Sequence, residues 1–234
     1  MLRVSVVSIL LVVTTRGALA LAPEAHLREL LAAESWSEGG QYCDRLPKRE
    51  GERYDVAKLD NDHFAEVAAL CAAVSSGAGD QDSADWWWFT ATAMDLTTAL
   101  GLLDGLRSQG LLLRLPPPRT PGTSSTANAG TTDEGKVTLP NGTKVQGGAV
   151  QLLERTKPPS WMRPPRAGMT RMVVEFLVDS HGTPRQPLLI FSNAPPRYRF
   201  QALWWLRGWR YSPATVDGQQ VDSLFQLTVT TSHN

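Results

Sequence analysis

Residues 115–135 (LPPPRTPGTSSTANAGTTDEG) divide the chain, because they contain almost no large apolar side chain. Pro, Gly, Ser and Thr dominate this stretch, and such a composition cannot bury enough surface to offset the entropy of ordering the backbone. We therefore expect a linker here. The 234 residues are 42% hydrophobic, so the parts on both sides of the linker are long enough to fold.

Residues 21–114 have the hydrophobic spacing of helices. Apolar side chains recur every three or four positions in residues 22–33 and 63–74, and the run DND at 60–62 offers N-cap side chains. Residues 82–106 predict one long helix, or two helices broken near Gly101. The helices on either side of residues 75–80 weakly resemble a tetratricopeptide- or Sel1-type repeat unit.

The residues after the linker alternate between strand and helix patterns. Residues 136–145 predict a hairpin around Asn141-Gly142, while residues 147–157 are ambiguous and include a candidate short helix. Strands are expected at 171–179, 186–192 and 220–230, with a helix at 197–208. We therefore predict an α+β chain in which residues 158–234 form a small antiparallel sheet with one packed helix, in the order β-β-α-β. The expected units are an N-terminal segment at 1–20, a helical domain at 21–114, the linker at 115–135, a hairpin and connector at 136–157, and the small sheet domain at 158–234.

The first twenty residues predict a cleaved secretory signal peptide. Arg3 precedes an apolar run at 4–13, and Ala18-Leu19-Ala20 fits a cleavage site. The alternative is an uncleaved inner-membrane anchor, although the run is shorter than a spanning helix requires. No transmembrane segment is expected after cleavage. An exported chain meets an oxidising compartment, where Cys43 and Cys71 are expected to form a disulfide rather than two buried thiols.

The residues that could carry catalysis do not form a known pattern. The chain has four His and two Cys, without the spacing of a metal site, a G-x-S-x-G turn, an H-E-x-x-H helix or a phosphate-binding loop. His63 lies near Asp60 and Asp62, which are more simply helix-capping residues. We predict no enzymatic activity, no metal and no cofactor.

The charge balance conceals two parts of opposite sign. Lys and Arg together number 23, as do Asp and Glu, which excludes a uniformly basic nucleic-acid-binding protein. Residues 21–114 hold 16 acidic and 8 basic side chains, whereas residues 158–234 hold 4 acidic and 8 basic ones. Either the two parts dock on each other, or each has a partner of opposite charge.

Two groups of tryptophans allow a structural or a functional interpretation. Trp86, Trp87 and Trp88 span most of a helix circumference, so they form either packing contacts or an exposed recognition patch. In the helix at 197–208, the spacing places Trp204 with Phe200 in the core and Trp205 in a partly exposed position.

A string of motifs in the last third of the chain resembles the C-terminal domain of TonB-type energy transducers. The resemblance covers residues 159–230. It rests on Val178-Asp179-x-x-Gly182, a second strand ending at Ser192, the segment Trp209-Arg210-Tyr211-x-Pro213-Ala214, and a turn at Gly218. The family's Tyr-Pro pair before the first strand is missing, and its anchor histidine has no counterpart in residues 1–20. The resemblance therefore implies the fold more than energy transduction.

The resemblance also implies a binding mode for the last strand. In that family the strand lies at a sheet edge and pairs with an extended peptide of an outer-membrane receptor, which is β-augmentation. The corresponding edge residues are Ser223, Leu224, Phe225, Gln226, Leu227, Thr228, Val229 and Thr230. The alternatives are that the 136–145 hairpin or a second copy of the chain covers this edge.

The expected function is that of a periplasmic, non-catalytic binding protein of a Gram-negative bacterium, with an envelope protein as partner and a role in TonB-dependent transport. The alternative is a structural or assembly adaptor of the cell envelope in which the TonB-like unit serves dimerisation or docking.

Overall fold

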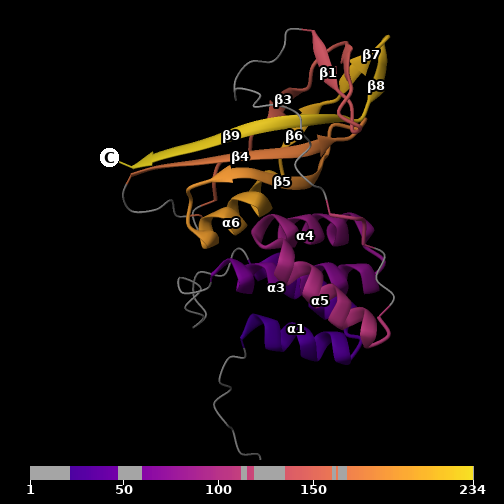
Figure 1. The fold of residues 1–234 in the computed structure, drawn as a ribbon, viewed down its shortest axis with the longest axis vertical. Coiled ribbons are helices and arrows are strands. Elements are labelled where there is room, and N and C mark those ends of the chain that lie inside the picture. The colour runs from indigo at the N-terminus through magenta and orange to yellow at the C-terminus, as the bar shows by residue number, and fades with distance from the viewer. Residues whose placement is uncertain are drawn as a thin grey trace, which may run out of the picture.

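The computed structural model describes residues 22–46, 60–111, 115–118, 135–159, 162 and 168–233. These residues form a mixed α and β structure, as predicted, with helices stacked below a curled antiparallel sheet (Figure 1). The predicted signal peptide and residues 119–134 of the predicted linker lie outside the described residues. The helices are α1 (Pro23–Ala32), α2 (Trp36–Arg45), α3 (Asn61–Gly77), α4 (Gln81–Met94), α5 (Leu96–Ser108) and α6 (Pro196–Leu206).

The break in the long predicted helix falls at Asp95 rather than near Gly101. Asp95 has an extended backbone, and its carboxylate accepts a hydrogen bond from the backbone N–H of Thr98 at 2.7 Å. An N-cap of this kind starts a new helix, whereas Gly101 stays inside α5. The sequence also gave no sign of α2, a polar and glycine-containing helix that tertiary contacts hold in place.

In the described residues, the strands form one large and two small sheets. The large sheet has the order β2-β1-β9-β4-β5, and the pairs β3-β6 and β7-β8 form the small ones. Residues 151–154 are strand β3 rather than a helix, and the predicted final strand divides at Asp222 into β8 and β9. The strand bounds are β1 (Lys136–Thr138), β2 (Lys144–Gln146), β3 (Gln151–Glu154), β4 (Gly168–Val178), β5 (Pro184–Ser192), β6 (Arg210–Ser212), β7 (Ala214–Val216), β8 (Gln219–Val221) and β9 (Ser223–His233).

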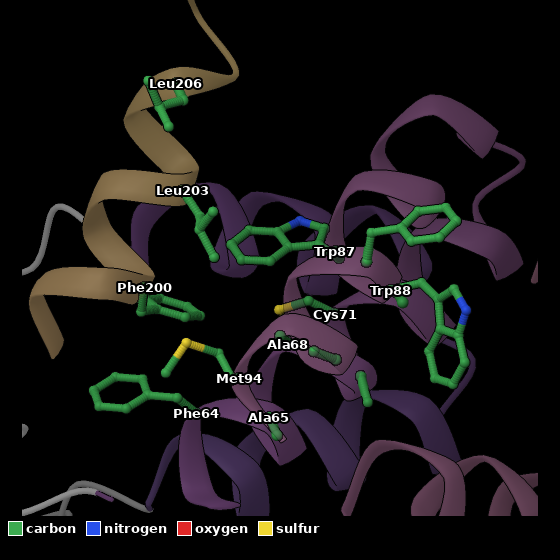
Figure 2. Close-up of a cluster of buried hydrophobic side chains, with 14 of the residues drawn as sticks. Phe64, Ala65, Ala68, Cys71, Trp87, Trp88, Met94, Phe200, Leu203 and Leu206 are labelled. Atoms are coloured by element: carbon green, nitrogen blue, oxygen red, sulfur yellow. The ribbon is translucent and has the colours of Figure 1, made fainter. Parts of the chain in front are cut away.

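The helices and the sheet share one hydrophobic core. Phe200 of α6 stacks against Trp87 of α4 and lies beside Phe64 of α3, with ring centroids 5.8 and 5.0 Å apart. Leu203, one turn further along α6, points toward the same tryptophan (Figure 2). A continuous cluster of buried side chains extends from α1 to the sheet, so the parts before and after the linker pack on each other.

Three arginines border this shared core. Arg185 of β5 forms an ion pair with Asp82 of α4, and Arg207 donates to Ser83 Oγ at 2.6 Å. Arg199 of α6 donates to Asn61 Oδ1 at 2.5 Å. All three extend from the basic part to the N-terminal turns of helices in the acidic part. Of the two outcomes that the charge division allowed, the structure has the docked one.

The predicted disulfide between Cys43 and Cys71 is present. Their Cα atoms are 5.7 Å apart, and both residues are buried. The bond joins α2 to α3. The two helices approach so closely that a Cβ added to Gly39 of α2 would lie 2.6 Å from the side chain of Val74 of α3. The disulfide and this close approach explain how a polar segment becomes a helix here.

Candidate functional site

Strand β9 is paired along its full length on one side and at a single position on the other. On one side it pairs with β4 without interruption, from Gly168↔His233 to Val178↔Ser223. On the other side it pairs with β1 only at Thr138↔Leu224. In the described part of the chain, no strand pairs with that side beyond Leu224. The hairpin therefore covers the start of the predicted edge and leaves the rest without a neighbouring strand.

The backbone groups that β9 turns to this outer side follow from hydrogen bonds on β4. Arg171 donates its N–H to Asn193 Oδ1 and accepts from Asn193 N–H, so both of its backbone groups point toward β5. Asp179 likewise donates its N–H to Thr183 O. Backbone direction alternates along a strand, so odd-numbered residues of β4 face β5 and even-numbered ones face β9. Given the register, the residues of β9 with N–H and C=O on the outer side are the even-numbered ones, Leu224, Gln226, Thr228, Thr230 and Ser232.

The side chains of β9 divide between the two faces of the sheet, as strand alternation predicts. Val229 is buried, and Phe225 and Leu227 pack partly buried against the core. The Phe225 ring lies 5.7 Å from Phe176 and 5.3 Å from Tyr211. The opposite face carries three half-buried side chains and one exposed one, Leu224, Gln226, Thr228 and Thr230.

Strand β5, at the opposite edge of the large sheet, packs against a helix. Helix α4 lies along the first half of β5 (Figure 1), where Pro184, Pro187 and Leu188 are buried. Arg185 binds Asp82 of α4 on one side and donates its Nε–H to Asp179 Oδ2 at 2.7 Å on the other. Since α4 occupies this position, the first half of β5 is less open to a new strand than the outer side of β9, whereas Ile190 and Phe191 in its second half are exposed.

The motif residues Asp179 and Gly182 build the turn between β4 and β5. Asp179 Oδ1 accepts from the backbone N–H groups of His181 and Thr183, both at 2.9 Å. Burial tends to raise the pKa of Asp179, but these hydrogen bonds and Arg185 outweigh it and lower the pKa below the usual value. Gly182 has φ +79° and accepts from the N–H of Tyr211. The turn therefore holds β6 in position.

The remaining motif residues also have structural positions. Val178 and Ala214 are fully buried, and the buried Trp209 ring packs edge-on against Trp205 at 4.9 Å. Ser192 Oγ accepts from Ala194 N–H at the end of β5. The rest are the exposed Arg210, the half-buried Pro213 and Gly218, which has φ +78° in the β7–β8 turn. Apart from Arg210, these residues shape the fold that presents β9.

The tryptophans are packing residues. Trp86, Trp87 and Trp88 are all at most 3% exposed, and Trp88 Nε1–H donates to Pro116 O at 2.8 Å. The interpretation of these three rings as an exposed recognition patch is therefore wrong. The expectation for α6 was also wrong, because Trp205 is buried and Trp204 is half-buried. Helix α6 packs on the sheet and on α3 and α4 together, so more than one of its faces is interior.

His63 has a local partner, Asp60. His63 Nδ1 lies 2.7 Å from Asp60 Oδ1, and that contact raises the pKa of His63 and lowers the pKa of Asp60. Asp60 also caps α3 through the backbone N–H of His63. Within the ranges that the structure describes, no three His, Cys, Asp or Glu side chains gather as a metal site would require.

Comparison with known proteins gives no assignment, since no protein-family model and no curated protein matches this chain. In the described residues, no helix is both long and apolar enough to cross a bilayer.

Proposed function

We propose that this protein is a periplasmic, non-catalytic binding protein that takes up an extended segment of an envelope or outer-membrane receptor protein by strand addition to β9. The TonB-like motifs, the disulfide and the open side of β9 support this proposal. The observation that carries it is the outer side of β9, where Gln226, Thr228 and Thr230 turn backbone N–H and C=O groups away from β4. Unpaired groups of this kind accept another strand.

Proline substitutions at alternate positions test strand addition specifically. Proline lacks an N–H donor and is tolerated where that N–H faces away from the sheet. Thr228→Pro removes an outward N–H and leaves the ladder with β4 intact. Leu227→Pro would instead remove a ladder bond, because the Leu227 N–H faces β4. Thr228→Pro is therefore the informative variant.

Gln220→Pro is the matched control. Thr215 exchanges backbone hydrogen bonds with Gly148, so its partner in the β7–β8 hairpin, Gln220, also has an N–H that points away from the paired strand. This substitution makes the same chemical change on a different edge.

The probe is a phage-displayed library of random heptapeptides. We expect the wild-type protein and Gln220→Pro to select binding peptides, and Thr228→Pro to lose at least tenfold in affinity for them while keeping its circular dichroism spectrum. Equal binding by Thr228→Pro would refute strand addition at this edge. A wild-type chain that selects no peptide, but sediments as a dimer that Thr228→Pro dissociates, would favour the dimerising adaptor.

A further inference from the structure

The length of an added strand is set by the β1–β2 hairpin. Thr138 occupies the outward backbone groups of Leu224, so a new strand begins opposite Gln226. The pairing of β9 with β4 continues to His233. About seven residues therefore fit, which corresponds to roughly 23 Å of extended chain.

The β1–β2 hairpin is held in place by backbone hydrogen bonds and by burial, so it can limit the length of an added strand. Gly148 and Thr215 exchange two backbone hydrogen bonds of 2.8 and 2.9 Å at its base, and Val137 is buried in the core. A Cβ on Gly147 would lie 2.2 Å from Thr215 O, which shows how closely the hairpin base approaches β7.

The side-chain chemistry of the added strand follows from the two faces of β9. Residues directly opposite each other in a sheet lie on the same face. Residues opposite Leu227 and Val229 would therefore extend the apolar face, and residues opposite Gln226, Thr228 and Thr230 would lie beside uncharged polar side chains. The outer segment from Phe225 to Thr231 contains no charged residue.

One hydroxyl on the polar face lacks a partner. Thr228 Oγ1 is buried and has no hydrogen-bond partner in the described structure. The same strand satisfies another hydroxyl by a cross-strand pair, in which Thr231 Oγ1 lies 2.5 Å from Thr170 Oγ1. A hydroxyl or amide side chain opposite Thr228 would complete a second pair of this kind.

We propose that the outer edge of β9 selects a segment of about seven residues in which uncharged polar side chains alternate with aliphatic ones. The polar positions lie opposite Gln226, Thr228 and Thr230, and the aliphatic ones opposite Leu227 and Val229. This inference rests on the proposed function, because it specifies the partner of the same edge.

The test compares the heptapeptides that the wild-type protein selects with those that Thr228→Lys selects. The lysine stem still covers the buried Val173, which faces residue 228 across the ladder. We expect Ser, Thr, Asn or Gln at every second position for the wild type. For Thr228→Lys we expect Asp or Glu to be enriched at least fivefold at one of those positions. Gln220→Lys, which adds the same charge on β8, should select the wild-type pattern.

The outcomes separate this inference from the function on which it rests. The inference would be overturned by selected peptides without alternation, or by an unchanged peptide pattern for Thr228→Lys. Strand addition itself would stand in that case if Thr228→Pro still abolished peptide binding. A wild-type protein that selects no peptide would overturn both. A selected peptide can also be lengthened at the end that lies opposite Gln226, toward the hairpin. This should change its affinity less than twofold, and a larger gain would refute the limit that the hairpin sets on the length of the added strand.

Discussion

The Trp87 ring lies 5.8 Å from the Phe200 ring, with an angle of 30° between the two planes. This contact joins α4, before the predicted linker, to α6, after it. Phe64 and Leu203 belong to the same buried cluster, so the aromatic contact lies inside a core that neither part could bury alone. We therefore expect the two parts to unfold together.

Substitution of Phe200 tests this joint unfolding. Phe200→Ala should lower the free energy of unfolding by about 3–5 kcal/mol, as expected for a buried phenylalanine. Urea unfolding followed by far-UV circular dichroism and by tryptophan fluorescence should give coincident transitions. Phe191→Ala is the control, because Phe191 is 50% exposed, and should cost less than about 1 kcal/mol. Two separate transitions in the wild-type protein would contradict a shared core.

Two turn glycines give a matched pair of substitutions. Gly182 and Gly218 have nearly equal φ values of +79° and +78°, but a Cβ at Gly182 would lie 1.9 Å from Tyr211 O, and a Cβ at Gly218 meets nothing within 4 Å. Gly218→Ala should cost about 1 kcal/mol from backbone strain alone. Gly182→Ala should cost about 3 kcal/mol or more, because β6 must also move. Equal losses in chemical denaturation would show that the contact with Tyr211 is unimportant.

Removal of the disulfide should destabilise the helical part. Cys43 and Cys71 are 28 residues apart in sequence, and a closed loop of that size corresponds to about 3–4 kcal/mol in the loop-entropy description. The Cys43→Ala/Cys71→Ala double variant should therefore melt at a lower temperature than the oxidised protein in calorimetry. Adding a reductant should lower the melting temperature of the wild type and leave that of the double variant unchanged. A shift in the double variant would assign the effect to something other than this bond.

Asp179 should make stability depend on acid pH. Its pKa is lowered in the folded protein, so its stabilising effect is complete above the usual aspartate pKa of about 3.9 and is lost as the pH falls through the lowered value. Asp179→Asn should cost about 1–3 kcal/mol at pH 7 through its hydrogen bonds. The difference from the wild type should shrink below about pH 4. Asp217→Asn, at an exposed turn position, is the control, and a difference for Asp179→Asn that did not vary with pH would contradict this assignment.

Much of the secondary structure could be predicted from the chain itself. The apolar runs that became β4 and β5 and the apolar spacing of α3 and α6 are local signals, and the elements that they predicted are present. Elements without a local signal were missed. The polar helix α2 depends on the disulfide and on the approach of Gly39 to Val74, and β3 depends on its pairing with β6.

The candidate site shows the same division. Residue alternation alone separated Phe225, Leu227 and Val229 from Gln226 and Thr228, since side chains alternate along any strand. The extent of the open edge was not predictable, because it depends on where the distant β1–β2 hairpin meets Leu224. The direction of each N–H required the hydrogen bonds between Arg171 and Asn193. For that reason the structure identifies Thr228, rather than Leu227, as the position for a proline test.

The sequence by itself determined the cysteine pair and the helical and strand segments that carry a local apolar pattern. It also determined the opposite charges of the two parts, because all of these follow from side-chain type and local spacing. Only the tertiary structure decided that the two parts dock through Trp87 and Phe200, that α4 packs along β5, and that no described strand pairs with the outer side of β9 from Gln226 onward. The physical reason is that burial and strand pairing join residues far apart in the chain, and local periodicity does not specify which distant surfaces meet.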